Sequence, residues 1–253
     1  GAGGSIGSEL CRQIVRLGPQ RLLLVEMSEP ALYQVDRELR LLAASKGIRV
    51  EIVPLLGNVH HRNRVREIMS RYGVQTVYHA AAYKHVPIVE QNIIEGIHNN
   101  VYSTWYAAEA ALECNVETFV QISTDKAVNP TNVMGASKRI AEIFTQSYFK
   151  HLMEGDENNR QQVTKFVTTR FGNVLGSNGS VLPRFKMQLE KGGPITVTHP
   201  DITRYFMTIP EACRLVLEAG AMGEGGEIYI FDMGKSVKIV DLAKKMVQLS
   251  GLE

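Results

Sequence analysis

Cysteine is scarce in this chain of 253 residues, and the three that are present lie far apart: Cys11, Cys114 and Cys213. They match neither a disulfide framework nor the paired spacing of a zinc site. The adjacent pair His60 and His61 has no further ligand at metal-binding spacing. We therefore expect no metal site, and the cysteine usage fits a reducing cytoplasm.

A charge excess and long apolar runs are missing as well. The 28 basic residues are balanced by 26 acidic ones, so we expect no polyelectrolyte surface for nucleic acid or for an anionic membrane. No stretch approaches the roughly 18 uninterrupted apolar residues of a membrane span, and no signal peptide is visible. The apolar share of 44% is nevertheless enough for a sizeable core.

Short apolar runs alternate with helical patterns along most of the chain. Such runs are typical of strands buried on both faces of a parallel sheet. They lie at 21–26, 48–53, 76–81, 118–123 and 165–170. The helical patterns lie at 5–17, 30–45, 60–72, 89–114 and 136–153. The polar, aperiodic stretch 154–162 predicts a mobile loop, and 194–198 and 227–231 predict two further strands. This alternation predicts an α/β fold, a Rossmann-like doubly wound parallel sheet with right-handed crossovers.

The chain opens on a glycine-rich turn, GAGGSIG, directly before an amphipathic helix. Such a turn lets backbone amides approach a pyrophosphate at the N-terminus of the helix, where the dipole favours anions. We therefore predict a dinucleotide site that includes Gly1, Gly3, Gly4, Ser5, Ile6 and Gly7. A turn of this kind normally follows a strand, and no residue precedes it here. We expect a fragment of a longer protein that lacks the first strand of the sheet.

Residues at the ends of the next strands predict the rest of the dinucleotide site. Glu26 can accept hydrogen bonds from both ribose hydroxyls and would repel a 2′-phosphate, which favours NAD over NADP; the alternative is a solvated strand end. Asn58, beside Val59, can make hydrogen bonds to adenine. Small residues further along would let the backbone lie against the cofactor, or would pack strand on helix; these are Ala80, Ala81 and Ala82.

The stretch ISTDKAVNPTNVMGASKR, residues 122–139, carries a more specific signal. Together with the glycine turn it resembles the extended short-chain dehydrogenases/reductases. More narrowly, it resembles the nucleotide-sugar 4,6-dehydratases of bacterial polysaccharide biosynthesis, of the capsular type that acts on UDP-N-acetylglucosamine. RFGNVLGSNGSVLPRF (170–185) and ITVTHPDITRYFMTIPEA (195–212) resemble the sugar-nucleotide segments of that family, and the resemblance covers nearly the whole chain.

The resemblance implies a dehydration carried out on an oxidoreductase scaffold. NAD takes a hydride from C4 of the sugar, and the resulting ketone acidifies the proton on C5. A base removes that proton while an acid protonates the departing C6 hydroxyl, and the hydride returns to C6. The cofactor is then regenerated in place, without net oxidation.

The resemblance also implies roles for individual residues. Asp125 would be the acid for the C6 hydroxyl and Lys126 the base at C5, at the end of a strand where ligands bind in such sheets. Lys138 would bind the nicotinamide ribose, and its charge would favour loss of the C4 proton. Thr124, an ordered water or the Asp125–Lys126 pair would take that proton. The alternative for Asp125 and Lys126 is an ion pair in a surface loop.

Further polar residues resemble substrate contacts of the family. A guanidinium can grip diphosphate oxygens with two hydrogen bonds, and we expect Arg204 to do so; the alternative for each arginine is a structural ion pair. The predicted substrate contacts are Lys84, Arg170, Asn173, Ser180, Val181 and Arg204. On this basis residues 1–174 form the NAD-binding domain, and residues 175–253 form mainly a sugar-nucleotide lobe with segments that return to the sheet.

Met134 stands where most relatives carry a tyrosine that moves the proton, four residues before Lys138. A thioether can neither donate nor accept a proton at a useful pH. An isolated methionine on a helix is most often core filler. The resemblance implies instead the branch that retains the C5 configuration and is anchored in the membrane. We therefore expect a cytoplasmic domain of an inner-membrane protein, with membrane contact only through segments outside this chain.

The sequence thus predicts a UDP-N-acetylglucosamine 4,6-dehydratase that binds NAD and a UDP-amino-sugar and that assembles as a homo-oligomer. Two alternatives remain open. A nucleotide-sugar 4-epimerase would need hydride transfer at C4 but no acid and base at C5 and C6. A non-catalytic NAD-binding regulator would have kept the fold and lost the chemistry together with the tyrosine.

Overall fold

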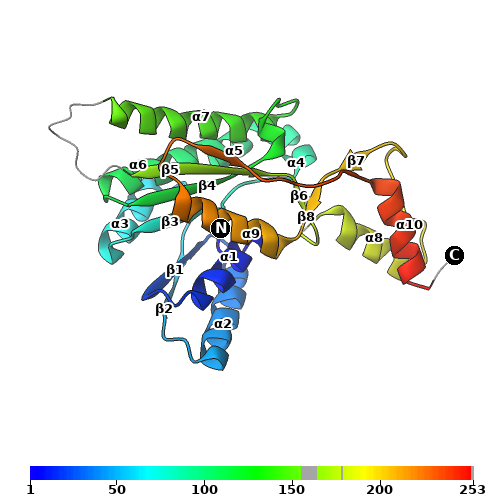
Figure 1. Cartoon of the computed structure of the whole chain (residues 1–253), viewed down its shortest axis with the longest axis horizontal. Coiled ribbons are helices and arrows are strands. Elements are labelled where there is room, and N and C mark those ends of the chain that lie inside the picture. The colour runs from blue at the N-terminus through cyan, green and yellow to red at the C-terminus, as the bar shows by residue number, and fades with distance from the viewer. Residues whose placement is uncertain (155–163, 178, 252–253) are drawn as a thin grey trace.

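The computed structural model describes residues 1–154, 164–177 and 179–251. Helices and strands alternate from α1 to β5, and the pairings in the main sheet are parallel. In Figure 1 this sheet runs through the middle of the molecule, with α7 along one side and α9 along the other. The predicted α/β class with a Rossmann-like parallel sheet is confirmed.

The longer strands form two parallel sheets rather than one. Four strands pair in the order β3-β4-β5-β9, and β1 pairs with β2 alone. The bounds are β1 Arg21–Glu26, β2 Glu51–Leu56, β3 Thr76–His79, β4 Thr118–Thr124, β5 Lys165–Phe171 and β9 Ile228–Ile230. The inner strand β4 is buried from Phe119 to Ser123 because helices cover both of its faces.

Helices α6 and α7 cover one face of the four-stranded sheet, and α9 covers the other with α1 beside it (Figure 1). The bounds of the helices up to the middle of the chain are α1 Ser5–Arg16, α2 Glu29–Lys46, α3 Arg62–Tyr72, α4 Val86–Gln91, α5 Ile93–Ile97 and α6 Ser103–Glu113. The later helices are α7 Val133–Met153, α8 Val181–Glu190, α9 Ile209–Met222 and α10 Ile239–Leu249.

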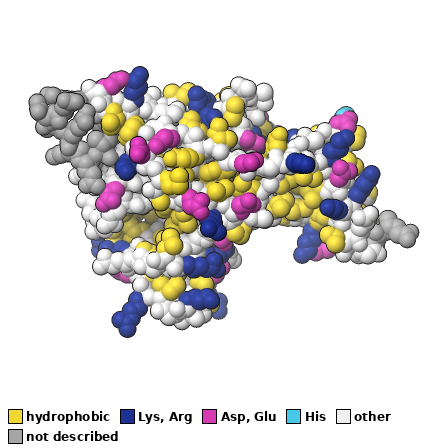
Figure 2. Space-filling model, viewed as in Figure 1, with side chains coloured by type: hydrophobic (Ala, Val, Ile, Leu, Met, Phe, Trp, Pro, Cys, Tyr) yellow, Lys and Arg dark blue, Asp and Glu magenta, His cyan; other side chains and the backbone are white. Residues whose placement is uncertain are grey.

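An apolar cavity of about 530 Å³ lies between β1 and β3, which do not pair. Leu22 and Leu23 of β1 line it on one side, and Val77 and Tyr78 of β3 line it on the other. Figure 2 shows a hollow between the part of the molecule that carries β1, β2 and α2 and the remainder.

Residues 175–251 contribute both to the main sheet and to a separate pair of helices. Helix α9 packs on β4 and β5, and β9 extends the main sheet. Helices α8 and α10 pack on each other around Phe185, Ile239 and Ala243, at one end of the molecule (Figure 1). Short strands join the main sheet and this pair of helices, and their bounds are β6 Asn173–Val174, β7 Thr203–Arg204, β8 Phe206–Met207 and β10 Val237–Lys238.

Two predicted elements differ in their limits. The second strand covers 51–56 instead of 48–53, because Gly47 ends α2 with φ 63° and the Ile48 amide still bonds the carbonyl oxygen of Ala43. The single helix expected over 89–114 is broken into α4, α5, a π-helix at His98–Tyr102 and α6. Asn92, with φ −135°, interrupts it, and its side-chain amide donates to the carbonyl oxygen of Ile88 at 2.9 Å.

The predicted strand at 194–198 is wrong, because these residues form no strand. Ile195 and Val197 produce the alternating pattern by packing on the cluster around Phe185. The backbone amide of Thr196 donates to the Gln188 side chain at 3.2 Å rather than to another strand. The predicted mobile loop at 154–162 lies, apart from Glu154, outside the described residues.

Two leucines on α2 test how much of the stability comes from the core around β1. Leu39 is fully buried there, whereas Leu41 on the same helix is 63% exposed. We expect Leu39→Ala to lower the free energy of unfolding by about 2–5 kcal/mol, since it leaves a cavity. Leu41→Ala is expected to change it by less than about 0.5 kcal/mol. Urea unfolding monitored by circular dichroism measures both, and equal losses would contradict this picture.

Candidate active site

The glycine turn before α1 lies against the ends of β1 and β3. The Ala2 amide donates to the carbonyl oxygen of Val25 at 3.2 Å, and a Cβ on Gly1 would lie 2.8 Å from the amide nitrogen of Ala81. A Cβ on Gly7 would lie only 1.9 Å from the carbonyl oxygen of Gly1. Glycine is therefore required at both positions, and the N-terminus of α1 is brought to the edge of the sheet.

Glu26 ends β1 with its carboxylate held by the backbone. One carboxylate oxygen accepts from the Gly3 amide at 3.0 Å, and the other accepts from the amides of Met27 at 2.9 Å and Ser28 at 3.0 Å. Burial alone would raise the pKa of Glu26, but the hydrogen bonds to the charged form lower it. The side chain is buried, so the alternative of a solvated strand end is wrong.

A cavity of about 270 Å³ opens where the glycine turn meets the ends of β1, β2 and β3. The predicted cofactor residues that line it are Gly1, Gly3, Gly4, Glu26, Asn58, Val59, Ala80, Ala81 and Ala82. Ser103 at the start of α6 also lines it, and the buried Oγ of Ser103 has no hydrogen-bond partner among the described residues. Ser103 could not be predicted from the sequence, because only the fold brings α6 to this cavity.

These features fit the nucleotide part of a dinucleotide. A Cβ at Gly1 would lie 2.8 Å from the Ala81 amide nitrogen and one at Gly3 would lie 2.6 Å from the Ala31 side chain, so glycine lets the turn pack closely beside the cavity. The carbonyl oxygen of the Asn58 side chain accepts from the His60 amide at 2.9 Å, which leaves its NH₂ group for a ligand. The Ile6 side chain packs against the hydrophobic cluster under α9, so its predicted part in cofactor binding is limited to the backbone.

Asn100 braces the loop after β3 against α7. Its side-chain oxygen accepts from the Tyr83 amide at 2.7 Å, and its amide group donates to the Tyr83 carbonyl oxygen and the Ser137 hydroxyl, both at 3.0 Å. Asn100 lies fully buried in the π-helix, a distortion that is frequent at functional sites. The loop that borders the cavity is thereby tied to the helix that carries Met134 and Lys138.

Thr124, Asp125 and Lys126 form a connected polar group where β4 ends. The Thr124 hydroxyl donates to Asp125 Oδ1 at 2.9 Å, and the Lys126 ammonium donates to the same oxygen at 2.9 Å. Lys126 Nζ also donates to the side-chain oxygen of Asn173 at 3.3 Å. The fold therefore brings Asn173 to the group, although 47 residues separate it from Lys126 in the chain.

The N-terminal end of α7 packs directly on this group. Asn132 caps the helix by accepting from the Gly135 amide at 2.8 Å, and a Cβ on Gly135 would lie 2.4 Å from the carbonyl oxygen of Lys126. Met134 and Lys138 are both buried on this helix, with exposed fractions of 4% and 7%. Burial lowers the pKa of Lys138 to about 8, which opens its ionisation to control by neighbouring charges.

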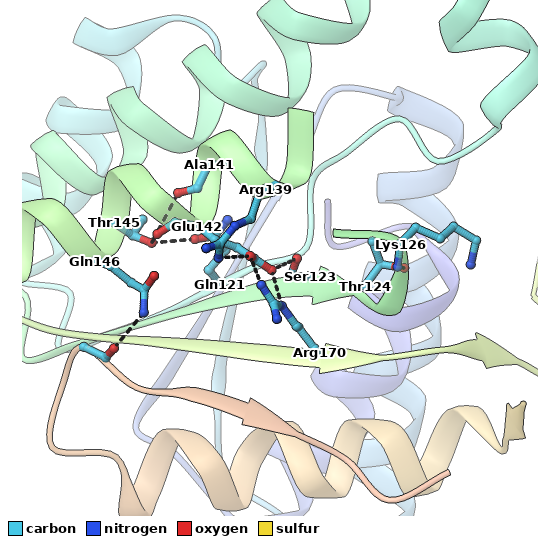
Figure 3. A network of polar contacts seen from close by, with 11 residues as sticks. Gln121, Ser123, Thr124, Lys126, Arg139, Ala141, Glu142, Thr145, Gln146 and Arg170 are labelled. Atoms are coloured by element: carbon cyan, nitrogen blue, oxygen red, sulfur yellow. Dashed lines mark hydrogen bonds and ion pairs between the residues drawn. The ribbon is translucent and has the colours of Figure 1, made fainter. Parts of the chain in front are cut away.

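Arg170 lies elsewhere than the sequence predicted. Its guanidinium holds the Glu142 carboxylate with two hydrogen bonds inside the protein, between β5 and α7 (Figure 3). It is 8% exposed, so the structural alternative describes its side chain and the prediction of a substrate contact is wrong. The sequence could not reveal this pairing, because Glu142 looks like any polar residue on a helix.

The loop after β3 meets the loop before α8. Lys84 Nζ, from the loop after β3, donates to the Ser177 hydroxyl before α8 at 3.3 Å, and partial burial lowers the pKa of Lys84. A Cβ on Gly179 would lie 2.3 Å from the ring of His85, so the loops touch at a second point. His85 and Ser177 were missed by the sequence reasoning, since neither stands in a recognised motif position.

The remaining predicted substrate residues lie on the short elements near α8. Ser180 precedes α8, and its buried Oγ has no hydrogen-bond partner among the described residues, while Val181 begins the helix half-buried. Arg204 is exposed on β7, where Nη1 donates to the Thr203 carbonyl oxygen at 2.8 Å. In the part of the chain that the structure describes, Arg204 forms no ion pair.

The described residues contain neither a metal-ligand cluster nor a membrane-spanning helix. Over 1–154, 164–177 and 179–251, no three His, Cys, Asp or Glu side chains gather in a way that would hold a metal ion. None of the helices in these ranges is long and apolar enough to cross a membrane.

Comparison with known proteins gives the family. The family described as "Polysaccharide biosynthesis protein" matches residues 1–253. The chain belongs to this family. The resemblance to nucleotide-sugar dehydratases of the extended short-chain dehydrogenase/reductase type is therefore confirmed at the level of the family.

The proteins to which this chain is similar differ in their described activities. The chain is 55% identical over 251 residues to the capsular polysaccharide biosynthesis protein CapD of Staphylococcus aureus, covering 99% of this chain and 40% of that protein. A UDP-glucose 4-epimerase of Rickettsia canadensis is 37% identical, covering 78% of the chain and 54% of the epimerase. The inverting UDP-N-acetylglucosamine 4,6-dehydratase of Campylobacter jejuni is 35% identical, covering 74% of the chain and 54% of the dehydratase.

The fold matches solved structures over its whole length. The dTDP-glucose 4,6-dehydratase DesIV of Streptomyces venezuelae, solved with NAD and TYD bound, superposes with a TM-score of 0.83 at 20% identity. The superposition covers all of this chain and 80% of DesIV. At this identity the match establishes the fold. The present chain spans about 40% of the length of CapD, its curated relative.

Two glycines of the turn test the close backbone contact. A methyl group at Gly7 would collide with the Gly1 carbonyl oxygen, whereas one at Gly4 would have its nearest neighbour at 3.5 Å, an ordinary contact. We expect Gly7→Ala to lower the free energy of unfolding by about 1–3 kcal/mol through overpacking, and Gly4→Ala to have a much smaller effect. Thermal unfolding without nucleotide measures this, and equal melting temperatures would refute the contact.

Proposed function

We propose that this chain is the catalytic domain of an NAD-dependent dehydratase that removes water across C5 and C6 of UDP-N-acetylglucosamine, giving the 4-keto-6-deoxy sugar nucleotide. The observation that carries the proposal is the hydrogen-bonded group of Thr124, Asp125, Lys126 and Asn173 at the end of β4. A dehydration needs an acid and a base side by side, and this group supplies both where parallel sheets bind their ligands.

Bound NAD would supply hydride transfer from C4 and back to C6. Asp125, the proposed acid, gives a proton to the C6 hydroxyl so that it leaves as water. Lys126, the proposed base, takes the proton from C5 in its neutral form and returns it to C5 when C6 is reduced. Asn173 holds the Lys126 nitrogen through its side-chain oxygen at 3.3 Å, and this hydrogen bond is compatible with either the charged or the neutral amine because both carry N–H groups.

Met134 cannot take the proton from the C4 hydroxyl, so another route is needed. The Thr124 hydroxyl donates to Asp125 Oδ1 at 2.9 Å and provides such a route. We propose that the C4 proton passes through Thr124 to Asp125, which then delivers it to the C6 hydroxyl. Asp125 thus begins and ends the cycle as a carboxylate, and no tyrosine is needed. Lys138 assists through its positive charge, which favours loss of the C4 proton.

Several finer points belong to the same proposal. Lys84, Ser180, Val181 and the exposed Arg204 are proposed contacts of the sugar nucleotide, Arg204 with the diphosphate. Met134 supports retention of the C5 configuration. Through the family resemblance, Met134 also supports a cytoplasmic domain of an inner-membrane protein. We further propose assembly as a homo-oligomer.

The proposed dehydration is tested directly with the protein, NAD and UDP-N-acetylglucosamine. Loss of 18 Da from the sugar nucleotide, about one water, is expected in the mass spectrum. Epimerisation at C4 without a change of mass would favour the second candidate function, that of a 4-epimerase. The similarity to the Rickettsia UDP-glucose 4-epimerase supports this candidate. NAD binding without any change of the sugar would favour a regulator and would refute the dehydratase.

Variants around the missing tyrosine test the proton route. We expect Met134→Ala to keep measurable activity, because its thioether takes part in no proton transfer. Asp125→Ala and Lys126→Ala are expected to reduce kcat by about 100-fold or more, since each removes a general acid or base. Circular dichroism and NAD binding check that each variant is folded. Loss of turnover in a folded Met134→Ala protein that still binds NAD would show that Met134 is more than a bystander.

The carboxylate of Glu26 tests the preference for NAD, which we propose over NADP. A 2′-phosphate would lie against this buried charge. Wild-type protein is therefore expected to bind NADH at least about tenfold more tightly than NADPH, and Glu26→Gln is expected to narrow the ratio by removing the repulsion. Fluorescence titration with both nucleotides gives the ratio. An unchanged ratio in the folded variant would assign the preference to other residues.

A further inference from the structure

A single buried carboxylate joins the three segments that carry the candidate residues. Glu142 on α7 is fully buried, and its Oε1 accepts from the Ser123 hydroxyl of β4 at 2.5 Å and from Arg170 Nε of β5 at 2.8 Å. Its Oε2 accepts from Arg170 Nη2 and from Arg139 Nη1, the latter at 3.1 Å. Figure 3 shows these side chains converging between the helix and the two strands.

The residues in these contacts lie one to four positions along the chain from proposed active-site residues. Ser123 immediately precedes Thr124 on β4, and Arg170 precedes Asn173 by three residues. Glu142 follows Lys138 by four residues, which places both on the same face of α7. A shift of this carboxylate would therefore displace the helix relative to both strand ends.

Among the described residues, the Glu142 carboxylate one turn away opposes the burial that lowers the pKa of Lys138. The guanidinium groups of Arg139 and Arg170 bind this carboxylate and reduce its effect. His79 on β3 also faces Lys138 and is neutral, because burial lowers its pKa to about 3. The 3₁₀ turn that packs on α7 carries Asp125 and Lys126, which neutralise each other in an ion pair.

We propose that Glu142 is a positioning residue, which fixes α7 against the ends of β4 and β5 and keeps Lys138 charged where the ribose of the dinucleotide binds. The part that concerns turnover rests on the proposed dehydratase function. The part that concerns the ionisation of Lys138 does not, and it is measured without substrate.

The ionisation of Lys138 is followed by NMR on protein labelled with ¹³C-lysine, with Lys138→Arg used to assign the signal. In Glu142→Gln the midpoint of the Lys138 titration is expected to fall by about one pH unit, since the opposite charge one turn away is lost. Glu38→Gln is the control. It removes a carboxylate on α2 that pairs with Arg12 of α1, and it should leave the midpoint of the Lys138 titration unchanged. An unchanged midpoint in folded Glu142→Gln would overturn the proposal.

Glu142→Gln leaves the Arg170 guanidinium buried without its partner, so this variant is at risk of unfolding. The double variant Glu142→Gln/Arg170→Gln removes that charge too. Glu142 is on the helix of Lys138, one turn away, whereas Arg170 reaches the carboxylate from β5, so the midpoint is still expected to fall in the double variant, by less than in Glu142→Gln. A midpoint at the wild-type value in the folded double variant would equally overturn the proposal.

Ser123→Ala tests position separately from charge. This variant removes the hydrogen bond between β4 and the carboxylate and leaves every charge in place. We expect the Lys138 midpoint to stay unchanged, while kcat for dehydration falls about three- to tenfold at an unchanged KM, because the reacting groups are less well aligned. An unchanged kcat would refute the positioning role. If wild-type protein shows no dehydration, the proposed function fails, while the titration result still decides the role of Glu142 toward Lys138.

Discussion

The parallel pairing of β4 with β5 is the constraint on which the site depends. The two strands pair in register from Thr118 opposite Lys165 to Thr124 opposite Phe171, so both end at the same edge of the sheet. The residues that follow them, Asp125 and Lys126 after β4 and Asn173 after β5, therefore meet although they are far apart in the chain. The strands hold this register because helices bury them on both faces, where a slip would expose apolar side chains and bury polar ones.

Charges inside the molecule are balanced close to this edge. The Glu142 carboxylate is fully buried and would be strongly destabilising alone, but two guanidinium groups and a hydroxyl satisfy both of its oxygens. Burial alone would raise the pKa of Glu142, and these partners lower it instead. Among the described residues, Lys138 one turn earlier has no comparable set of partners, so its ionisation depends on its burial and on the charges around it. The same helix thus carries one fixed charge and one adjustable charge.

The two sites are held together by contacts that lie between them. Asn100 connects the loop at the dinucleotide cavity to α7, and the close approach of Gly135 to the Lys126 carbonyl seats α7 on the turn after β4. A dinucleotide bound at the glycine turn and a sugar bound beside Lys126 would consequently face one rigid helix. Precise placement of this kind matters for hydride transfer, because the rate depends steeply on the alignment of the reacting groups.

The sequence by itself determined the alternation of helices and strands and the glycine turn, since each is a local pattern with a local physical cause. The roles of Thr124, Asp125 and Lys126 came from the family resemblance and are proposals. Prediction from the sequence failed where the cause is not local. The helix predicted over 89–114 is broken at Asn92, and an apolar alternation at 194–198 arises from packing on Phe185 rather than from a strand.

Only the tertiary structure decided the partners of buried polar groups. Arg170 looked like a substrate contact until the fold paired it with Glu142, and Ser103 gained significance only through the cavity that it lines. The physical reason is that a polar side chain follows the hydrogen-bond partners available in space, and spacing along the chain does not reveal which partners the packing of helices on a sheet will supply.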